Sequence, residues 1–195
     1  MKPIIFEFTD GNEYLSSHSG LGLVGALLAR TKIKKRIDKI QLPGCMEPKI
    51  PHHDIVYSMT GLLCLGKPDF DAIEPFRSDR FFSQSLSIGQ CPASSTLRQR
   101  LDVVGNYFDQ IIKEESASLI SHTAPNITPI TTSTCDYIPL DIDVSPFDNS
   151  KTKKEGVSRT YKGKDGFSPN FSYIGREGYI INAELRPGKQ HTCFS

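Results

Sequence analysis

Polar and apolar residues alternate in the stretch DYIPLDIDVSPF, which starts at Asp136. One side carries four apolar residues: Ile138, Leu140, Ile142 and Val144. Asp141 and Asp143 point the other way, so the period of two predicts a β-strand with one apolar face, ended by Pro146. Two neighbouring carboxylates can share a divalent cation, and oxygen ligands favour Mg²⁺ or Mn²⁺ over zinc. The alternative is an ordinary solvent-exposed strand face.

Helical periodicity predicts a series of helices in the first part of the chain. They span residues 21–40, 52–66, 69–73, 78–86 and 94–112. Gly22 and Gly25 weaken the first of them, whereas Gly66 is a suitable helix stop. The core of this region is expected to contain four aromatic residues: Phe70, Phe76, Phe81 and Phe82.

Strands are predicted at residues 4–9, 171–174 and 179–185, in addition to the acidic strand. A tight turn bounded by Gly175 and Gly178 joins the last two. Strict alternation in the last strand would place Tyr179 and Ala183 on one face. Glu184 lies in the same strand and is expected to be an ordinary strand residue rather than a metal ligand. Residues 121–134 are rich in Thr and Pro and are predicted to be a linker. The expected fold class is therefore α+β.

Composition adds few constraints. The formal net charge is +1, so any affinity for nucleic acid has to come from local clusters. The chain has five cysteines and no CxxC pair, which argues against a zinc site and a disulfide framework. It shows neither a signal-peptide pattern nor an apolar run long enough to span a bilayer, so we expect a cytoplasmic protein with no membrane partner.

Three clusters could contact DNA. In the second half of the 21–40 helix, Lys34, Lys35 and Arg36 would rest on phosphates; a solvated helix end is the alternative. At the start of the 94–112 helix, an Arg-Gln-Arg run follows short polar residues, as in a recognition helix; an amphipathic helix with a charged outer face is the alternative. The candidate residues there are Ser95, Thr96, Arg98, Gln99 and Arg100.

The third cluster lies beyond the acidic strand. Between Lys151 and Lys189, nine Lys or Arg residues stand against four Asp or Glu residues. The candidate DNA contacts there are Lys153, Lys154, Arg159 and Lys162. Cations that hold a DNA strand beside carboxylates that hold metals would suit phosphodiester chemistry, whereas surface charge on a hairpin loop is the alternative.

Several motifs in order carry a resemblance to a known family. The chain contains LDID, then KKEG, YKG, a hydrophobic strand and LRPG, and upstream it contains PHHDIVYSMTGLLCLGKPDF, FRSDRFF and CPASSTLRQRLD. This order resembles the DDE group 1 transposases of bacterial insertion sequences, the IS-thirteen-eighty family. The resemblance covers nearly the whole chain.

The resemblance implies a helical DNA-binding region at 1–120, a linker at 121–134 and the first strands of a ribonuclease-H-like catalytic domain at 135–195. It implies that Asp143, or alternatively Asp141, is the first of three acids that hold two Mg²⁺ or Mn²⁺ ions. The second Asp and the Glu have no counterpart here, so we expect a C-terminally truncated transposase that binds the metals incompletely and is inactive alone. The implied partners are the terminal inverted repeats of the element and a second copy or a full-length transposase. A non-catalytic DNA-binding remnant that inhibits transposition is the alternative.

Overall fold

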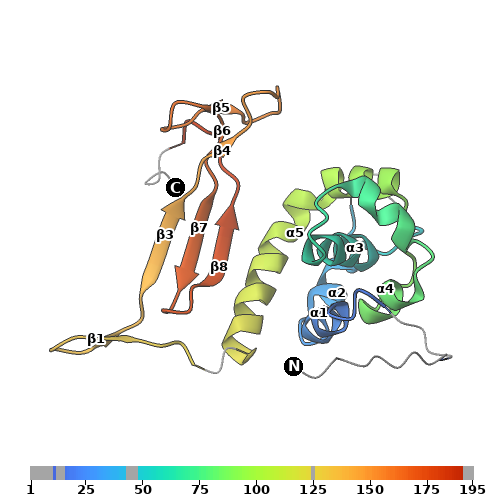
Figure 1. The fold of residues 1–195 in the computed structure, drawn as a ribbon, viewed down its shortest axis with the longest axis horizontal. Coiled ribbons are helices and arrows are strands. Elements are labelled where there is room, and N and C mark those ends of the chain that lie inside the picture. The colour runs from blue at the N-terminus through green and yellow to red at the C-terminus, as the bar shows by residue number, and fades with distance from the viewer. Residues whose placement is uncertain (1–10, 12–15, 43–47, 124–125, 191–195) are drawn as a thin grey trace, which may run out of the picture. The chain divides into compact units, whose positions relative to one another are not determined.

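The chain is built of helices and small antiparallel sheets, which confirms the α+β class (Figure 1). The structure is a computed structural model that describes residues 11, 16–42, 48–123 and 126–190. The chain divides into two compact units, Met1–Ala29 with Gln41–Val104 and Arg30–Ile40 with Gly105–Ser195. We call them the helical unit and the mixed unit. The predicted domain bounds stay a prediction, and the predicted strand at 4–9 lies outside the described residues.

The helical unit is assembled from short helices around an apolar core. It contains α1 (Leu21–Leu28), α3 (His52–Cys64), the 3₁₀ helix η1 (Phe70–Phe76), α4 (Arg80–Ser85) and the beginning of α5 (Ser94–Thr123). Of the four aromatic residues expected in the core, Phe76 and Phe82 are buried with ring centroids 4.8 Å apart, while Phe70 and Phe81 are half-buried. None of the helices in the described part of the chain is long and apolar enough to cross a membrane.

A buried carboxylate joins two segments of the helical unit. Asp54 is fully buried in the first turn of α3 and accepts hydrogen bonds from the backbone N–H groups of Gly89 (3.0 Å) and Gln90 (2.8 Å). His53 Nε2 lies 3.0 Å from the same carboxylate. Because a buried carboxylate is stable only when its oxygens are satisfied, this contact fixes the loop before α5 against α3.

The prediction of one helix over residues 21–40 is wrong. The structure has two helices there, α1 and α2 (Ile33–Ile37), with Lys32 in a non-helical conformation between them. The backbone N–H of Lys32 donates to the buried carboxylate of Glu115 on α5 at 2.7 Å. Local periodicity cannot show this contact, because its acceptor is 83 residues away in sequence.

The strands in the described part of the mixed unit form three small sheets. Strands β1 (Ile130–Thr131) and β2 (Asp136–Tyr137) pair with each other. Strands β3 (Leu140–Val144), β7 (Asn170–Ile174) and β8 (Tyr179–Glu184) lie side by side in the order β3-β7-β8 (Figure 1). Strands β4 (Phe147–Asp148), β5 (Ser158–Arg159) and β6 (Asp165–Phe167) have the order β4-β6-β5. All these pairs are antiparallel.

A β-bulge corrects the predicted alternation in β8. Tyr173 pairs with Ile180, but Ser172 pairs with Asn182, so Ile181 is the extra residue. Tyr179 therefore shares a face with Asn182, and the strict alternation that grouped it with Ala183 is wrong. A bulge inserts one residue into a strand and reverses the faces of everything beyond it.

The two glycines of α1 provide a matched test of this packing. A Cβ on Gly25 would lie 1.6 Å from the carbonyl oxygen of Ser85 in α4, whereas one on Gly22 would meet nothing within 4 Å. We expect Gly25→Ala to lower the free energy of unfolding by about 1–3 kcal/mol, because the helices must separate. Gly22→Ala should raise it by up to about 1 kcal/mol through helix propensity. Urea unfolding of both variants measures the difference; equal stabilities would contradict the α1–α4 packing.

Candidate nucleic-acid interface

The two predicted metal ligands lie on one face of β3. Antiparallel pairing places Asp141 opposite Tyr173 and Asp143 opposite Phe171 on β7. Both carboxylates are exposed, and Asp143 Oδ2 accepts a hydrogen bond of 3.1 Å from the hydroxyl of Ser145. Residues two apart on a strand lie about 6.5 Å from each other, so both side chains can reach the same space.

These carboxylates suit a hard divalent cation, but they are a partial ligand set. The described residues contain no group of three or more His, Cys, Asp or Glu side chains that could hold a metal ion. An Mg²⁺ ion bound by two carboxylates would keep most of its water ligands. A complete two-metal centre therefore does not follow from this part of the chain.

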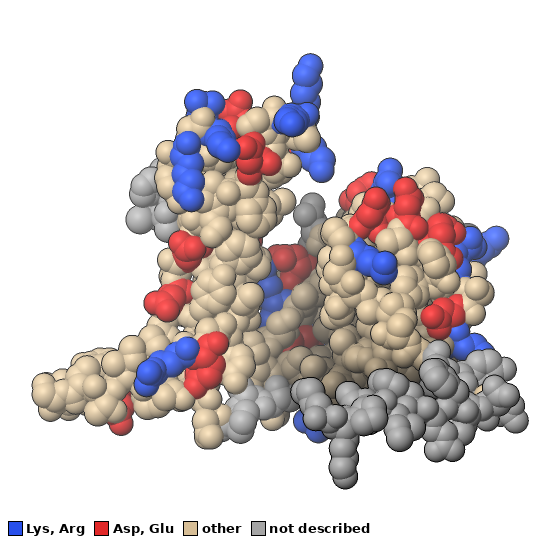
Figure 2. All heavy atoms as spheres, in the orientation of Figure 1, with Lys and Arg blue, Asp and Glu red and all other residues tan. Residues whose placement is uncertain are grey.

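Basic side chains gather over the small β4-β6-β5 sheet (Figure 2). Two of them are paired there: Lys164 with Asp148 at 3.0 Å and Arg159 with Asp165 at 3.6 Å. The hydrogen bonds from Ser150 and the ammonium of Lys164 hold the pKa of Asp148 far below its usual value. Four exposed lysines of this region make no ion pair with a described residue: Lys151, Lys153, Lys154 and Lys162.

The predicted cluster on α2 is divided between two roles. Lys34 and Lys35 are exposed, whereas Arg36 binds Glu114 at 2.6 Å and Glu115 at 2.9 Å. Burial alone would raise the pKa of Glu115, but the Lys32 N–H and the Arg36 guanidinium outweigh it and lower that pKa. Arg36 thus stabilises the contact between α2 and α5, and the two lysines remain accessible to an external anion.

The predicted recognition residues at the start of α5 are divided in the same way. Ser95 and Gln99 are exposed, Thr96 is half-buried, and the Arg98 guanidinium stacks over the Phe70 ring at 5.4 Å. Arg100 turns inward, where it donates to the carbonyl of Ile50 at 3.1 Å and lies 2.7 Å from His52 Nδ1. Arg98 and Gln99 remain exposed to solvent, while Arg100 joins α5 to the start of α3.

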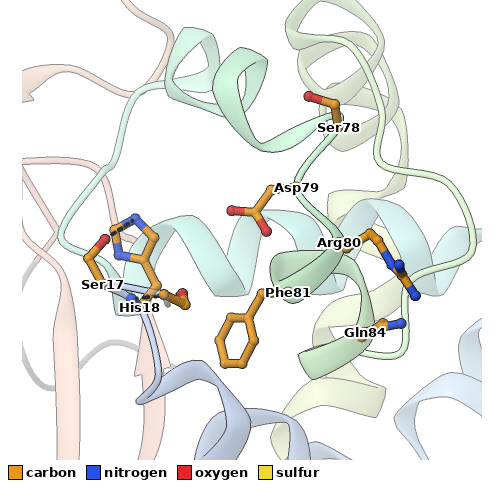
Figure 3. A pocket seen from close by; sticks show the side chains of 8 residues that line it. Ser17, His18, Ser78, Asp79, Arg80, Phe81 and Gln84 are labelled. Atoms are coloured by element: carbon orange, nitrogen blue, oxygen red, sulfur yellow. Dashed lines mark hydrogen bonds between the residues drawn. The ribbon is translucent and has the colours of Figure 1, made fainter. Parts of the chain in front are cut away.

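A pocket of about 600 Å³ in the helical unit was not anticipated from the sequence. Figure 3 shows the carboxylate of Asp79 and the ring of Phe81 facing His18, with Arg80 and Gln84 directed away. Asp79 caps α4 by accepting the N–H of Phe82 at 3.0 Å, and His18 packs against Phe76. These polar groups serve local structure, and neither their types nor their spacing along the chain indicated a pocket.

Compared with protein families, with curated proteins and with solved structures, the chain matches none. The assignment of function therefore rests on the motifs and on the geometry described above.

The glutamates that bind Arg36 give a pH-dependent prediction. Glu115→Gln should lower the free energy of unfolding near neutral pH by about 1–3 kcal/mol, because it weakens two partly buried hydrogen bonds, from the Lys32 N–H and the Arg36 guanidinium. Since folding lowers the pKa of Glu115, its stabilisation is present above the unfolded value of 4.5 and is lost as the pH falls through the lower, folded value. The difference between wild type and variant should shrink over that acidic range in urea unfolding.

The control is Glu114→Gln, because Glu114 binds the same guanidinium from an exposed position where solvent screens the charge. We expect Glu114→Gln to lower the free energy of unfolding less than Glu115→Gln does. An effect of Glu115→Gln that does not change with pH would show that its carboxylate does not hold α2.

Proposed function

We propose that this protein is a DNA-binding protein of the DDE transposase type and that β3-β7-β8 begins a ribonuclease-H-like sheet. The observation that carries the proposal is the placement of Asp141 and Asp143 on one face of β3, at the edge of an antiparallel sheet continued by β7 and β8. The family resemblance implies a metal-binding acid on the first strand of such a sheet, and the position of Asp143 on β3 supports the proposal. The basic surface over β4-β6-β5 gives this acidic strand a neighbouring site for phosphates.

Electrostatics supports the DNA-binding part of the proposal. The lysines at 151, 153, 154 and 162 make no ion pair with described residues, so a phosphate can bind them without breaking a salt bridge. Lys34 and Lys35 on α2 offer the same contact, and Arg98 and Gln99 offer donors for base edges. The proposed target is the terminal inverted repeats of an insertion sequence, and the proposed location is the cytoplasm, where such DNA resides.

The carboxylates define the proposed chemistry. Asp143, with Asp141 as the alternative, would hold Mg²⁺ or Mn²⁺; when bound, such ions activate a nucleophile and stabilise the leaving oxygen in displacement at phosphorus. The Ser145 hydroxyl orients the carboxylate of Asp143 through its hydrogen bond. The basic side chains hold the DNA strand, and additional copies of the protein or of a full-length transposase are the proposed protein partners.

A second candidate is a non-catalytic DNA-binding protein that occupies element ends and inhibits transposition. The observation that favours it is that the described residues supply two clustered carboxylates and no third ligand. The two candidates share the DNA-binding surface. They differ in whether Asp141 and Asp143 bind metal and in whether DNA is cut in its presence.

Duplex binding tests the shared part. The full chain should bind a duplex carrying terminal inverted repeats more tightly than a shuffled duplex in fluorescence anisotropy, with and without Mg²⁺. Lys153→Ala with Lys154→Ala should reduce the slope of log K against log salt by up to about 1.8, at about 0.9 per phosphate contact. Lys67→Ala, an exposed lysine of the helical unit, is the control. Absence of duplex binding at low salt would refute the proposal.

Metal binding separates the two candidates. Mn²⁺ added to the full chain should enhance water-proton relaxation, and Asp143→Asn or Asp141→Asn should reduce this enhancement because each removes one oxygen ligand. The larger loss identifies the principal ligand. Asp136→Asn, an exposed acid on β2, is the matched control. If the enhancement persists in the Asp141→Asn, Asp143→Asn double variant, Mn²⁺ binds at another site. Mg²⁺-dependent cleavage of element ends by the full chain would exclude the second candidate, the non-catalytic inhibitor.

A further inference from the structure

Tyr161 is an exposed aromatic side chain on a well-bonded turn. It lies between β5 and β6 with 71% of its surface exposed. The turn is closed by Thr160, whose N–H and hydroxyl both donate to the carbonyl of Lys164 at 2.8 Å, and by the N–H of Gly163, which donates to the Thr160 carbonyl at 2.9 Å. Gly163 has φ +74°, which a glycine adopts without strain. The hydrogen-bonded conformation of the turn therefore keeps the Tyr161 ring exposed.

The ring borders a pocket of about 500 Å³. Its lining comes from three separate segments: Val144 at the end of β3, Arg159 to Tyr161, and Gly188 to Gln190. The Tyr161 hydroxyl donates to the carbonyl of Val144 at 3.4 Å, and the N–H of Lys189 donates to the hydroxyl of Ser158 at 3.0 Å. These two contacts join the segments into one site at the end of the acidic strand.

Gly188 shows how closely the last segment packs. A Cβ at this position would lie 2.1 Å from the carbonyl oxygen of Ser158 and 2.5 Å from that of Gly166. Only a glycine fits this close to the two carbonyl groups, and the residue that follows it, Lys189, lines the same pocket as Arg159.

Three basic side chains lie near the Tyr161 ring or line the pocket that it borders: Lys162, Arg159 and Lys189. Lys162 Nζ lies 5.9 Å from the centroid of the Tyr161 ring. Arg159 has a long ion pair of 3.6 Å with the exposed Asp165, and Lys189 makes no ion pair with a described residue. An exposed aromatic face among cations is the combination that binds single-stranded nucleic acid, in which bases stack on the ring and phosphates meet the cations.

We propose that this pocket binds an unpaired stretch of DNA, with one base stacked on Tyr161 and the adjoining phosphates on Arg159 and Lys189. The inference rests on the proposed DNA-binding function and names the form of DNA that this site takes. A paired base has both faces covered by its neighbours in the duplex, so only an unpaired or extruded base can stack on the ring. The pocket is also large enough for a nucleotide.

The test uses tryptophan as a reporter, because the chain contains none. In the full chain, Tyr161→Trp introduces a single indole whose emission should be quenched when an oligothymidylate strand is added. Tyr137→Trp is the matched control, since Tyr137 is also exposed, at 55%, but lies on β2 outside the pocket. Quenching of both variants to the same extent, or of neither, would overturn the proposal.

Affinity measurements complete the test. Tyr161→Ala should weaken binding of the single strand at least about fivefold, while Tyr161→Phe should retain most of it, because stacking needs the ring. Arg159→Ala and Lys189→Ala should each reduce the salt slope by about 0.7. Circular dichroism checks that the variants are folded. If Tyr161→Ala is not folded, the quenching of Tyr161→Trp still measures binding at this site.

The outcomes distinguish this inference from the proposed function. Normal duplex binding, together with single-strand affinity that is unchanged by Tyr161→Ala, would overturn the stacking site alone. Quenching at position 161 by the single strand without any duplex binding would support the site and refute duplex recognition. Absence of binding to either DNA would overturn both.

Discussion

The pairing of β3 with β7 is the constraint on which the candidate site depends. Its register sets Asp141 opposite Tyr173 and Asp143 opposite Phe171, so both carboxylates share one face. A shift of one residue would move both acids to the opposite face and exchange them with Leu140 and Ile142. The same pairing fixes Val144, whose carbonyl receives the Tyr161 hydroxyl. The backbone hydrogen bonds of this pairing therefore fix the position of the acidic strand β3 at the edge of the basic pocket, within one unit.

For the candidate site, the positions of the charged side chains matter more than the net charge of the chain. The chain is close to neutral, yet its cations divide into those that bind acids of the same chain and those that do not. Arg36 and Lys164 belong to the first kind, with glutamates on α5 and Asp148 as partners. Lys35 and Lys153 belong to the second, because they are exposed and make no ion pair with described residues. Only the second kind can bind phosphate without breaking an internal ion pair. Composition alone therefore could not identify the candidate interface.

The sequence predicted the elements better than their interactions. The first part of α5, the helix α3 with its stop at Gly66, and the strands β3 and β7 follow directly from periodicity and turn residues. The predicted end of α5 at residue 112 is wrong, because the helix continues to Thr123 and enters the predicted linker. Three further features did not follow: the break before α2, the bulge in β8 and the inward turn of Arg100. The break and the inward turn each depend on a partner distant in sequence, and the bulge depends on pairing with β7. The Tyr161 pocket was missed for the same reason, since its wall combines three segments that only the folded chain brings together.

The hydrogen bonds of the β5–β6 turn bear on the binding role proposed for Tyr161. A flexible loop must lose conformational entropy when its side chain is held against a ligand, and that loss offsets much of the stacking energy. The turn at Thr160 has already lost this freedom, because its hydrogen bonds to Lys164 and Gly163 form without any ligand. Folding alone would gain more by burying the ring than by exposing it, since an exposed aromatic ring forgoes the free energy of burial. A rigid turn that presents an exposed ring among cations thus favours binding over a purely structural role for Tyr161.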